Sequence, residues 1–217
     1  MLFQIPDVLS AEELSQIQQT LAQAEFIDGK ATAGWYAKQV KHNQQLPSVT
    51  GQPLEAIIKI ALSRHPLFQV GVRPKQLHSL RFSRYSVGMS YGTHADNAMM
   101  GSHRSDISFT LFLNAPTDYE GGELVVEGTD DEQSYKLPEG HAIIYPSSTL
   151  HRVNEVTQGQ RLVVVGWVQS LVRDPAQREL LFDIDTVRRS IFAQHGKTAE
   201  FDLLSKSVSN LLRRWAE

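Results

Sequence analysis

Two residues that commonly bind metals, His94 and Asp96, stand two positions apart in the stretch Tyr91-Gly-Thr-His-Ala-Asp-Asn97. Side chains of an extended segment alternate between two faces, so an imidazole and a carboxylate at this spacing can point to the same side. The pair alone is weak evidence, because a solvated polar loop would look the same. Further ligands are needed before the stretch predicts a metal site.

His151, in the run Ser148-Thr-Leu-His-Arg-Val-Asn154, supplies a third candidate ligand at the start of a predicted strand. Two imidazoles and one carboxylate leave other coordination positions open, which suits Fe(II) that must take up a co-substrate and oxygen. Zinc more often has a fourth protein ligand or a bound water. The remaining histidines have no partner at a comparable spacing: His42, His65, His78, His103, His141 and His195.

Arg161 opens the most apolar strand of the chain, ten residues after His151. It alternates with Val163, Val165 and Trp167, which places its guanidinium on a face shared with bulky apolar groups. A buried guanidinium requires an anion. We expect His151 and Arg161 to share one face of a hairpin with a three-residue loop, Thr157–Gly159, in which Gly159 has a left-handed conformation.

The elements that must position these residues follow from the hydrophobic pattern. A capping box at Ser10 predicts a helix over residues 10–24, and a second helix is expected to begin at Gln52-Pro53 and to end before Pro66. From about residue 76, seven short β-rich runs follow without intervening helices, which indicates an antiparallel sandwich or barrel, most commonly a jelly roll.

The predicted fold class is therefore α+β, mainly β, in three parts. Residues 1–75 form a helical segment packed on the core, residues 76–172 form a jelly-roll core, and residues 173–217 form a helical extension. The apolar positions of this extension exceed what two short helices can bury against each other. We expect them to cover the jelly roll or a second subunit, and a homodimer through these helices is one expectation.

The composition argues against several classes of function, namely cysteine chemistry and binding to nucleic acid or membranes. The chain has 217 residues, no cysteine and a formal net charge of -3. Without cysteine there is no disulfide, thiolate nucleophile or cysteine-ligated metal. The charge gives no general attraction to nucleic acid or anionic lipid, and no apolar run is long enough to span a membrane. These features predict a cytoplasmic protein that binds neither nucleic acid nor membrane.

Several motifs together match a known pattern: RYSVGMSYGTHADN, RSDISFTLFL, YPSSTLHRV and a helical tail after QSLVRD. They resemble the Fe(II)- and 2-oxoglutarate-dependent dioxygenases of the prolyl-4-hydroxylase type, and most closely the bacterial PKHD-type hydroxylases. The resemblance covers nearly the whole chain. It implies a double-stranded β-helix, which is a jelly roll, with Fe(II), 2-oxoglutarate and O2 as cofactors and L-ascorbate as a reductant.

The resemblance also implies residue roles. His94, Asp96 and His151 would bind the catalytic iron, and Arg161 would bind the distal carboxylate of 2-oxoglutarate. Tyr85 corresponds to a tyrosine that assists at this carboxylate in relatives, with core packing as the alternative role. Candidate substrate contacts lie in loops beside the metal and among inward aromatics: Trp35, Tyr36, Asn97, Met99, Met100 and Trp167.

The predicted reaction is hydroxylation of a substrate with decarboxylation of 2-oxoglutarate to succinate and CO2. Association of relatives with bacterial iron-uptake genes suggests a small-molecule substrate related to siderophores, or an amino-acid or peptidyl one. Two alternatives from other classes stay open: a non-catalytic jelly roll that binds a metal or small ligand, and a zinc-dependent hydrolase. Arg161 and the open coordination positions favour the oxygenase.

Overall fold

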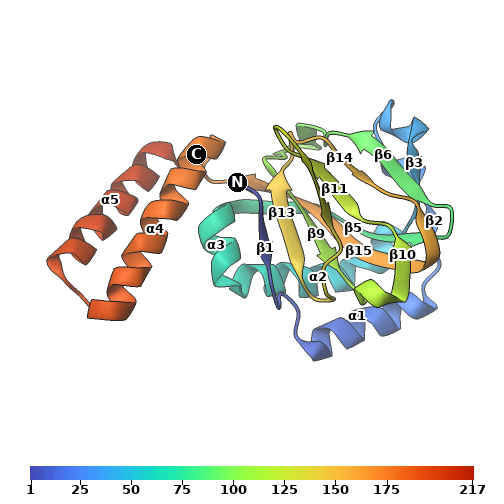
Figure 1. Ribbon diagram of the computed structural model, residues 1–217, viewed down its shortest axis with the longest axis horizontal. Coiled ribbons are helices and arrows are strands. Elements are labelled where there is room, and N and C mark those ends of the chain that lie inside the picture. Colours follow the sequence, from blue (N-terminus) through green and yellow to red (C-terminus); the bar gives the residue numbers. More distant parts are fainter.

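The computed structural model describes residues 1–217 as a two-sheet core with helices on one side and a helical hairpin at the C-terminal end (Figure 1). The helices are α1 (Ala11–Gln23), α2 (Ser48–Arg64), α3 (Pro66–Val72), α4 (Pro175–His195) and α5 (Ala199–Trp215). The strands are β1 (Phe3–Ile5), β2 (Ile27–Asp28), β3 (Lys41–His42), β4 (Gln44–Gln45), β5 (Pro74–Ser86), β6 (Ser90–His94), β7 (Met99–Met100), β8 (His103–Arg104), β9 (Ile107–Phe112), β10 (Tyr119–Gly121), β11 (Leu124–Glu127), β12 (Glu132–Tyr135), β13 (Ala142–Pro146), β14 (His151–Val153) and β15 (Val156–Ser170).

The two larger sheets form the expected jelly roll. The major sheet has the order β1-β13-β9-β15-β5-β4-β2, with β10 also paired to β15. The minor sheet has the order β12-β11-β14-β6-β3. Every strand pair is antiparallel, and each of the seven β-rich runs of the sequence contains a strand. The candidate site residues must therefore be sought in the space between the two sheets.

The prediction that His151 and Arg161 lie on one hairpin is wrong. Strand β14 pairs with β6 and β11 in the minor sheet, whereas β15 pairs with β5, β9 and β10 in the major sheet. The chain crosses from one sheet to the other between Val153 and Val156, so no turn at residues 157–159 sets their register. Gly159 does have the expected positive φ of 72°, but it lies within β15 opposite Tyr119.

The apolar core divides between the two faces of the major sheet. Its outer face packs on the N-terminal helices in a cluster of 23 buried residues that includes Ile17 of α1, Ile58 of α2 and Phe109 of β9. A second cluster of 12 buried residues, including Phe112 and Val163, lies between the sheets. At about 25 cal/mol per Å² of apolar surface, this burial is the main force that holds the helices on the sheet. The helices thus fix the major sheet as a rigid wall for the space between the sheets.

Helix α1 begins where the sequence predicted, and helix α2 does not. Helix α1 begins as expected, with Ser10 accepting from the Glu13 N–H while Glu13 accepts from the Ser10 N–H. The start expected for α2 is wrong, since the helix begins at Ser48 and carries Pro53 inside it. Pro53 cannot donate to the Val49 carbonyl four residues earlier. Val49 is 82% exposed, so water can take the place of this donor.

The C-terminal helices form a hairpin that projects away from the sheets instead of covering them (Figure 1). The hairpin encloses a small core of Val172, Leu181 and Val208. Helix α4 contacts the rest of the chain through Asp185, near its middle, which is 1% exposed and forms an ion pair at 3.6 Å with Arg73 at the end of α3. The expectation that this extension covers the jelly roll is therefore wrong. No helix combines the length and apolar composition needed to cross a membrane.

Candidate functional site

Three potential metal ligands meet between the sheets. His94 is the last residue of β6 and His151 is the first residue of β14, and these two residues lie directly opposite each other in the minor sheet. Asp96 follows two residues after the end of β6. One ligand atom from each of the three residues lies within 4.8 Å of the others, and His151 Nε2 is 3.8 Å from Asp96 Oδ2. The structure brings together all three residues that the sequence singled out.

Backbone carbonyls orient both imidazoles. His94 Nδ1 lies 2.8 Å from the Gly92 carbonyl, and His151 Nδ1 lies 3.0 Å from the Thr149 carbonyl. A carbonyl can only accept, so each Nδ1 must carry the proton and each Nε2 keeps its lone pair. Such bonds to the far ring nitrogen are the usual way in which a protein fixes the tautomer of a metal-binding histidine.

Asp96 reaches the site from a loop and not from an extended strand. Its Oδ2 accepts a hydrogen bond from Ser108 Oγ at 2.6 Å, and its N–H donates to the Ser147 carbonyl at 3.3 Å. The Ser108 and Ser147 hydroxyls are 2.8 Å apart. Ser108 was not singled out in the sequence, although it interrupts the apolar run Ile107–Phe112 on the inward face. These bonds hold the carboxylate beside the two histidines.

The electrostatics of the site suit a divalent cation. Burial, assisted by the nearby His151 ring, lowers the pKa of His94 to about 4, so this imidazole is neutral at pH 7 and able to donate a lone pair. The donor set is two imidazole nitrogens and one carboxylate oxygen, and no other Asp, Glu or His joins the cluster. A facial set of three such donors with open positions is the arrangement typical of non-haem Fe(II). The residues therefore fit iron.

Arg161 lies in the same cavity with no partner for its charge. Its side chain is 1% exposed, and none of its three guanidinium nitrogens makes a hydrogen bond. Instead its guanidinium carbon lies 5.1 Å from the ring centroid of Tyr85 and 5.5 Å from that of Phe112. An unpaired buried charge costs several kcal/mol, so the site is incomplete without an anion.

Tyr85 faces Arg161 across the β5–β15 pair. It is 3% exposed, packs in the same apolar cluster as Phe112 and also lines the cavity. Burial raises the pKa of its hydroxyl, an effect that the charge of Arg161 opposes. Its hydroxyl stays protonated at neutral pH and can serve as a donor, so both roles expected for Tyr85 are compatible with its position.

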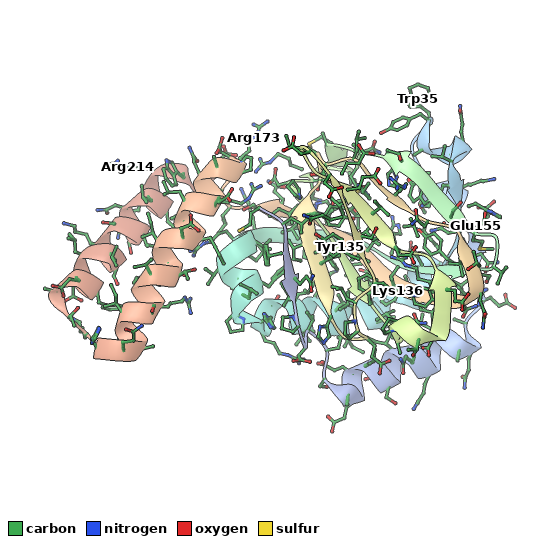
Figure 2. All side chains as sticks on the ribbon, viewed as in Figure 1. Trp35, Tyr135, Lys136, Glu155, Arg173 and Arg214 are labelled. Atoms are coloured by element: carbon green, nitrogen blue, oxygen red, sulfur yellow. The ribbon has the colours of Figure 1, made fainter.

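A cavity of about 340 Å³ opens between the sheets and contains the triad, Tyr85 and Arg161. Four of the six expected substrate contacts line it: Tyr36, Asn97, Met100 and Trp167. The other two, Met99 and Trp35, do not line it, and they are 54% and 83% exposed. Trp35 points outward from the loop that follows Gly29–Thr32 (Figure 2), while Tyr36 donates to the Ala95 carbonyl at 3.1 Å.

Two further residues of the cavity have no clear signal in the sequence. Lys41 and Arg81 both line it, although no motif surrounds either of them. Lys41 belongs to the two-residue strand β3, which residue pattern alone does not reveal. Arg81 lies on the inward face of β5, four residues before Tyr85. The sequence did not indicate that they face inward: Leu80 and Phe82 flank Arg81, an alternation that would place Arg81 on the face opposite these apolar residues.

Comparison with known proteins gives concordant matches. Residues 80–169 match the 2OG-Fe(II) oxygenase superfamily, and residues 175–217 match the PKHD-type hydroxylase C-terminal domain. A PKHD-type hydroxylase from a Picosynechococcus species is 64% identical over 219 residues and is covered completely, as is the present chain.

Two solved structures share the fold. A prolyl-4-hydroxylase from Pseudomonas putida is 22% identical, with a TM-score of 0.52 over 78% of this chain and 92% of that one. A prolyl hydroxylase from Trichoplax adhaerens, solved with a peptide fragment of the hypoxia inducible factor oxygen degradation domain, is 14% identical, with a TM-score of 0.57 over 82% and 86% of the two chains.

Proposed function

The chain belongs to the PKHD-type hydroxylases of the 2OG-Fe(II) oxygenase superfamily, and from this membership we propose that His94, Asp96 and His151 are its iron ligands and that Arg161 binds the distal carboxylate of 2-oxoglutarate. The protein is thus an Fe(II)- and 2-oxoglutarate-dependent dioxygenase. The observation that carries the residue assignment is the buried, unpaired guanidinium of Arg161 in the same cavity as three convergent ligand atoms.

When bound, the iron activates O2 for oxidation of a substrate C–H bond, with decarboxylation of 2-oxoglutarate to succinate and CO2. The chain's own residues position and shield the reactants. The carbonyls of Gly92 and Thr149 hold the two imidazoles with Nε2 toward the cavity, and Ser108 holds Asp96. In this proposal Arg161 fixes the far end of the co-substrate, and Tyr85, its neighbour across the β5–β15 pair, donates its hydroxyl proton to the same carboxylate.

We propose a small-molecule or peptidyl substrate that enters beside the loop containing Trp35 and Tyr36. The cavity reaches this loop, because Thr32, Ala33, Gly34 and Tyr36 are among its lining residues. The Trichoplax prolyl hydroxylase was solved with a peptide, which supports the peptidyl choice by likeness of fold. On the resemblance alone we propose L-ascorbate as the reductant.

The reaction is tested by adding Fe(II) and 2-oxoglutarate to the purified protein and measuring succinate in the presence of candidate siderophores, amino acids and peptides. We expect iron-dependent consumption of 2-oxoglutarate that increases with the correct substrate. Tight zinc binding with no iron-dependent consumption would instead favour the hydrolase or the binding module.

We further propose that the C-terminal hairpin joins two copies of the chain. Apolar side chains on its surface are left uncovered: Leu180, Val187, Phe192 and Leu203 are each 47–57% exposed. Placing a charge at Phe192 by Phe192→Glu should halve the mass seen by light scattering. Gln194→Glu, which adds the same charge at an exposed position of α4, should leave the mass unchanged. A monomeric wild-type protein would refute the dimer.

A further inference from the structure

Lys41 carries an unpaired charge inside the cavity. Its side chain comes from β3 of the minor sheet and only 5% of the residue is exposed. Its Nζ donates to Thr32 Oγ1 at 3.0 Å and lies 5.3 Å from the ring centroid of Tyr91, and it forms no ion pair. Long cationic side chains are rarely buried without an anionic partner.

The contact with Thr32 does not neutralise this charge. The Thr32 hydroxyl donates its own proton to Gln45 Oε1 at 2.6 Å, so Thr32 offers Lys41 a neutral acceptor. An ammonium has three donors, and only one is engaged. Two N–H groups of Lys41 therefore remain for a ligand.

Arg81 is a second cation at the same cavity without an acidic partner. It projects from the inward face of β5, is half-buried, and donates to the Leu80 carbonyl next to it in the chain. Burial first, and then the charge of Arg81, lower the pKa of Lys41 to about 8, against the opposite influence of Asp96 and Asp28. The two cations thus act on each other, and at pH 7 Lys41 still carries its proton.

The charges of the cavity do not balance even when its proposed occupants are included. The lining holds three cations, Lys41, Arg81 and Arg161, and one carboxylate, Asp96. On the proposed function, iron adds two positive charges and the two carboxylates of 2-oxoglutarate remove them, with Arg161 serving the distal one. Lys41 and Arg81 are left over, on the inner faces of opposite sheets.

We propose that Lys41 and Arg81 bind a carboxylate of the prime substrate, so that the molecule hydroxylated by this enzyme carries an acidic group close to the C–H bond that reacts. This inference rests on the proposed function and narrows its substrate class. An ammonium and a guanidinium from opposite walls can hold a carboxylate between them by charge-assisted hydrogen bonds. A free acidic amino acid or a peptide with an acidic side chain or C-terminus would supply such a group.

The test uses acetate as the probe and acetamide as its neutral counterpart of the same size. The protein is loaded with Mn(II) and with N-oxalylglycine, an unreactive analogue of 2-oxoglutarate that fills the co-substrate site. Proximity to Mn(II) should accelerate the relaxation of the acetate methyl protons, and acetamide should be unaffected. Lys41→Met and Arg81→Met should each weaken acetate binding roughly thirtyfold, the scale for removing one partner of a buried charge pair.

Matched variants distinguish acetate bound by Lys41 and Arg81 from acetate bound elsewhere. Lys38→Met removes an exposed lysine three residues away and should leave acetate binding unchanged, while Lys41→Arg should largely restore it. Equal acetate relaxation in wild type, Lys41→Met and Arg81→Met would overturn the proposal, because acetate would then be bound to the metal or to another part of the protein. Equal relaxation of acetamide would overturn it as well.

A second measurement excludes a structural role for Lys41. Replacing a buried ion by an apolar side chain of similar volume is often neutral or stabilising. Without ligands, Lys41→Met should therefore unfold at the same denaturant concentration as wild type or a higher one, and a lower midpoint would identify Lys41 as a structural residue. Failure of wild type to bind N-oxalylglycine would refute the proposed function; N-oxalylglycine binding without acetate binding would refute only the acidic-substrate inference.

Discussion

Replacing His94, Asp96 or His151 with alanine is expected to abolish iron-dependent turnover of 2-oxoglutarate. Each residue supplies one of only three protein ligand atoms within 4.8 Å of one another, and no nearby acid or histidine can substitute. Loss of a residue that merely orients a ligand costs about 10–100-fold in affinity, so loss of a ligand should cost more than about a hundredfold. The measurements are iron retained after gel filtration and succinate formed.

The same variants should keep their fold. Each histidine substitution removes one part-buried hydrogen bond to the carbonyl of Gly92 or Thr149, which predicts a destabilisation of about 0.5–1.5 kcal/mol. His195→Ala is the matched control, since His195 is an exposed histidine at the end of α4, outside the cluster. Iron binding and turnover that survive in any of the three variants would contradict the assignment of that ligand.

The second large effect is expected at Arg161. Arg161→Leu should weaken 2-oxoglutarate binding by ~2–5 kcal/mol, a few tens to several thousandfold, because the distal carboxylate would be desolvated without a cationic partner. Arg161→Lys should weaken it less, since an ammonium keeps the charge but lacks the planar pair of donors. Calorimetric titration of 2-oxoglutarate into the anaerobic iron-loaded variants measures both effects. Iron affinity without co-substrate should hardly change, and Arg161→Leu with wild-type affinity would show that this guanidinium does not bind 2-oxoglutarate.

The sequence predicted most of the site because its key residues carry local signals. Seven alternating runs between turn residues predicted a jelly roll, and the alternation of Arg161 with apolar residues predicted its burial. Asp96 lies beside His94 and His151 as expected, but the segment that carries it is a loop and not the extended strand that the sequence predicted. Strand β6 ends at His94, so Asp96 is aimed by its bonds to Ser108 and Ser147, which lie on other strands and loops.

What the sequence could not predict depends on contacts between distant segments. Thr157–Gly159 has the composition of a hairpin turn, yet the chain changes sheets before it, and strand pairing across a jelly roll has no local signature. Lys41 and Arg81 are ordinary cations in sequence, and only tertiary structure shows that neither has an acidic partner. The placement of the C-terminal helices likewise involves contacts between distant segments, such as the ion pair of Arg73 with Asp185 and the stacking of Phe3 on Phe182.

The proposed arrangement holds iron on His94, Asp96 and His151 and 2-oxoglutarate on Arg161 within one cavity. It is tested most directly by adding 2-oxoglutarate to the anaerobic Fe(II) protein and recording the charge-transfer absorbance that chelation produces. We predict a band that saturates in wild type, needs much higher 2-oxoglutarate in Arg161→Leu and is missing in His151→Ala. A wild-type protein without the band, or an Arg161→Leu variant that saturates at the same 2-oxoglutarate concentration as wild type, would contradict the claim.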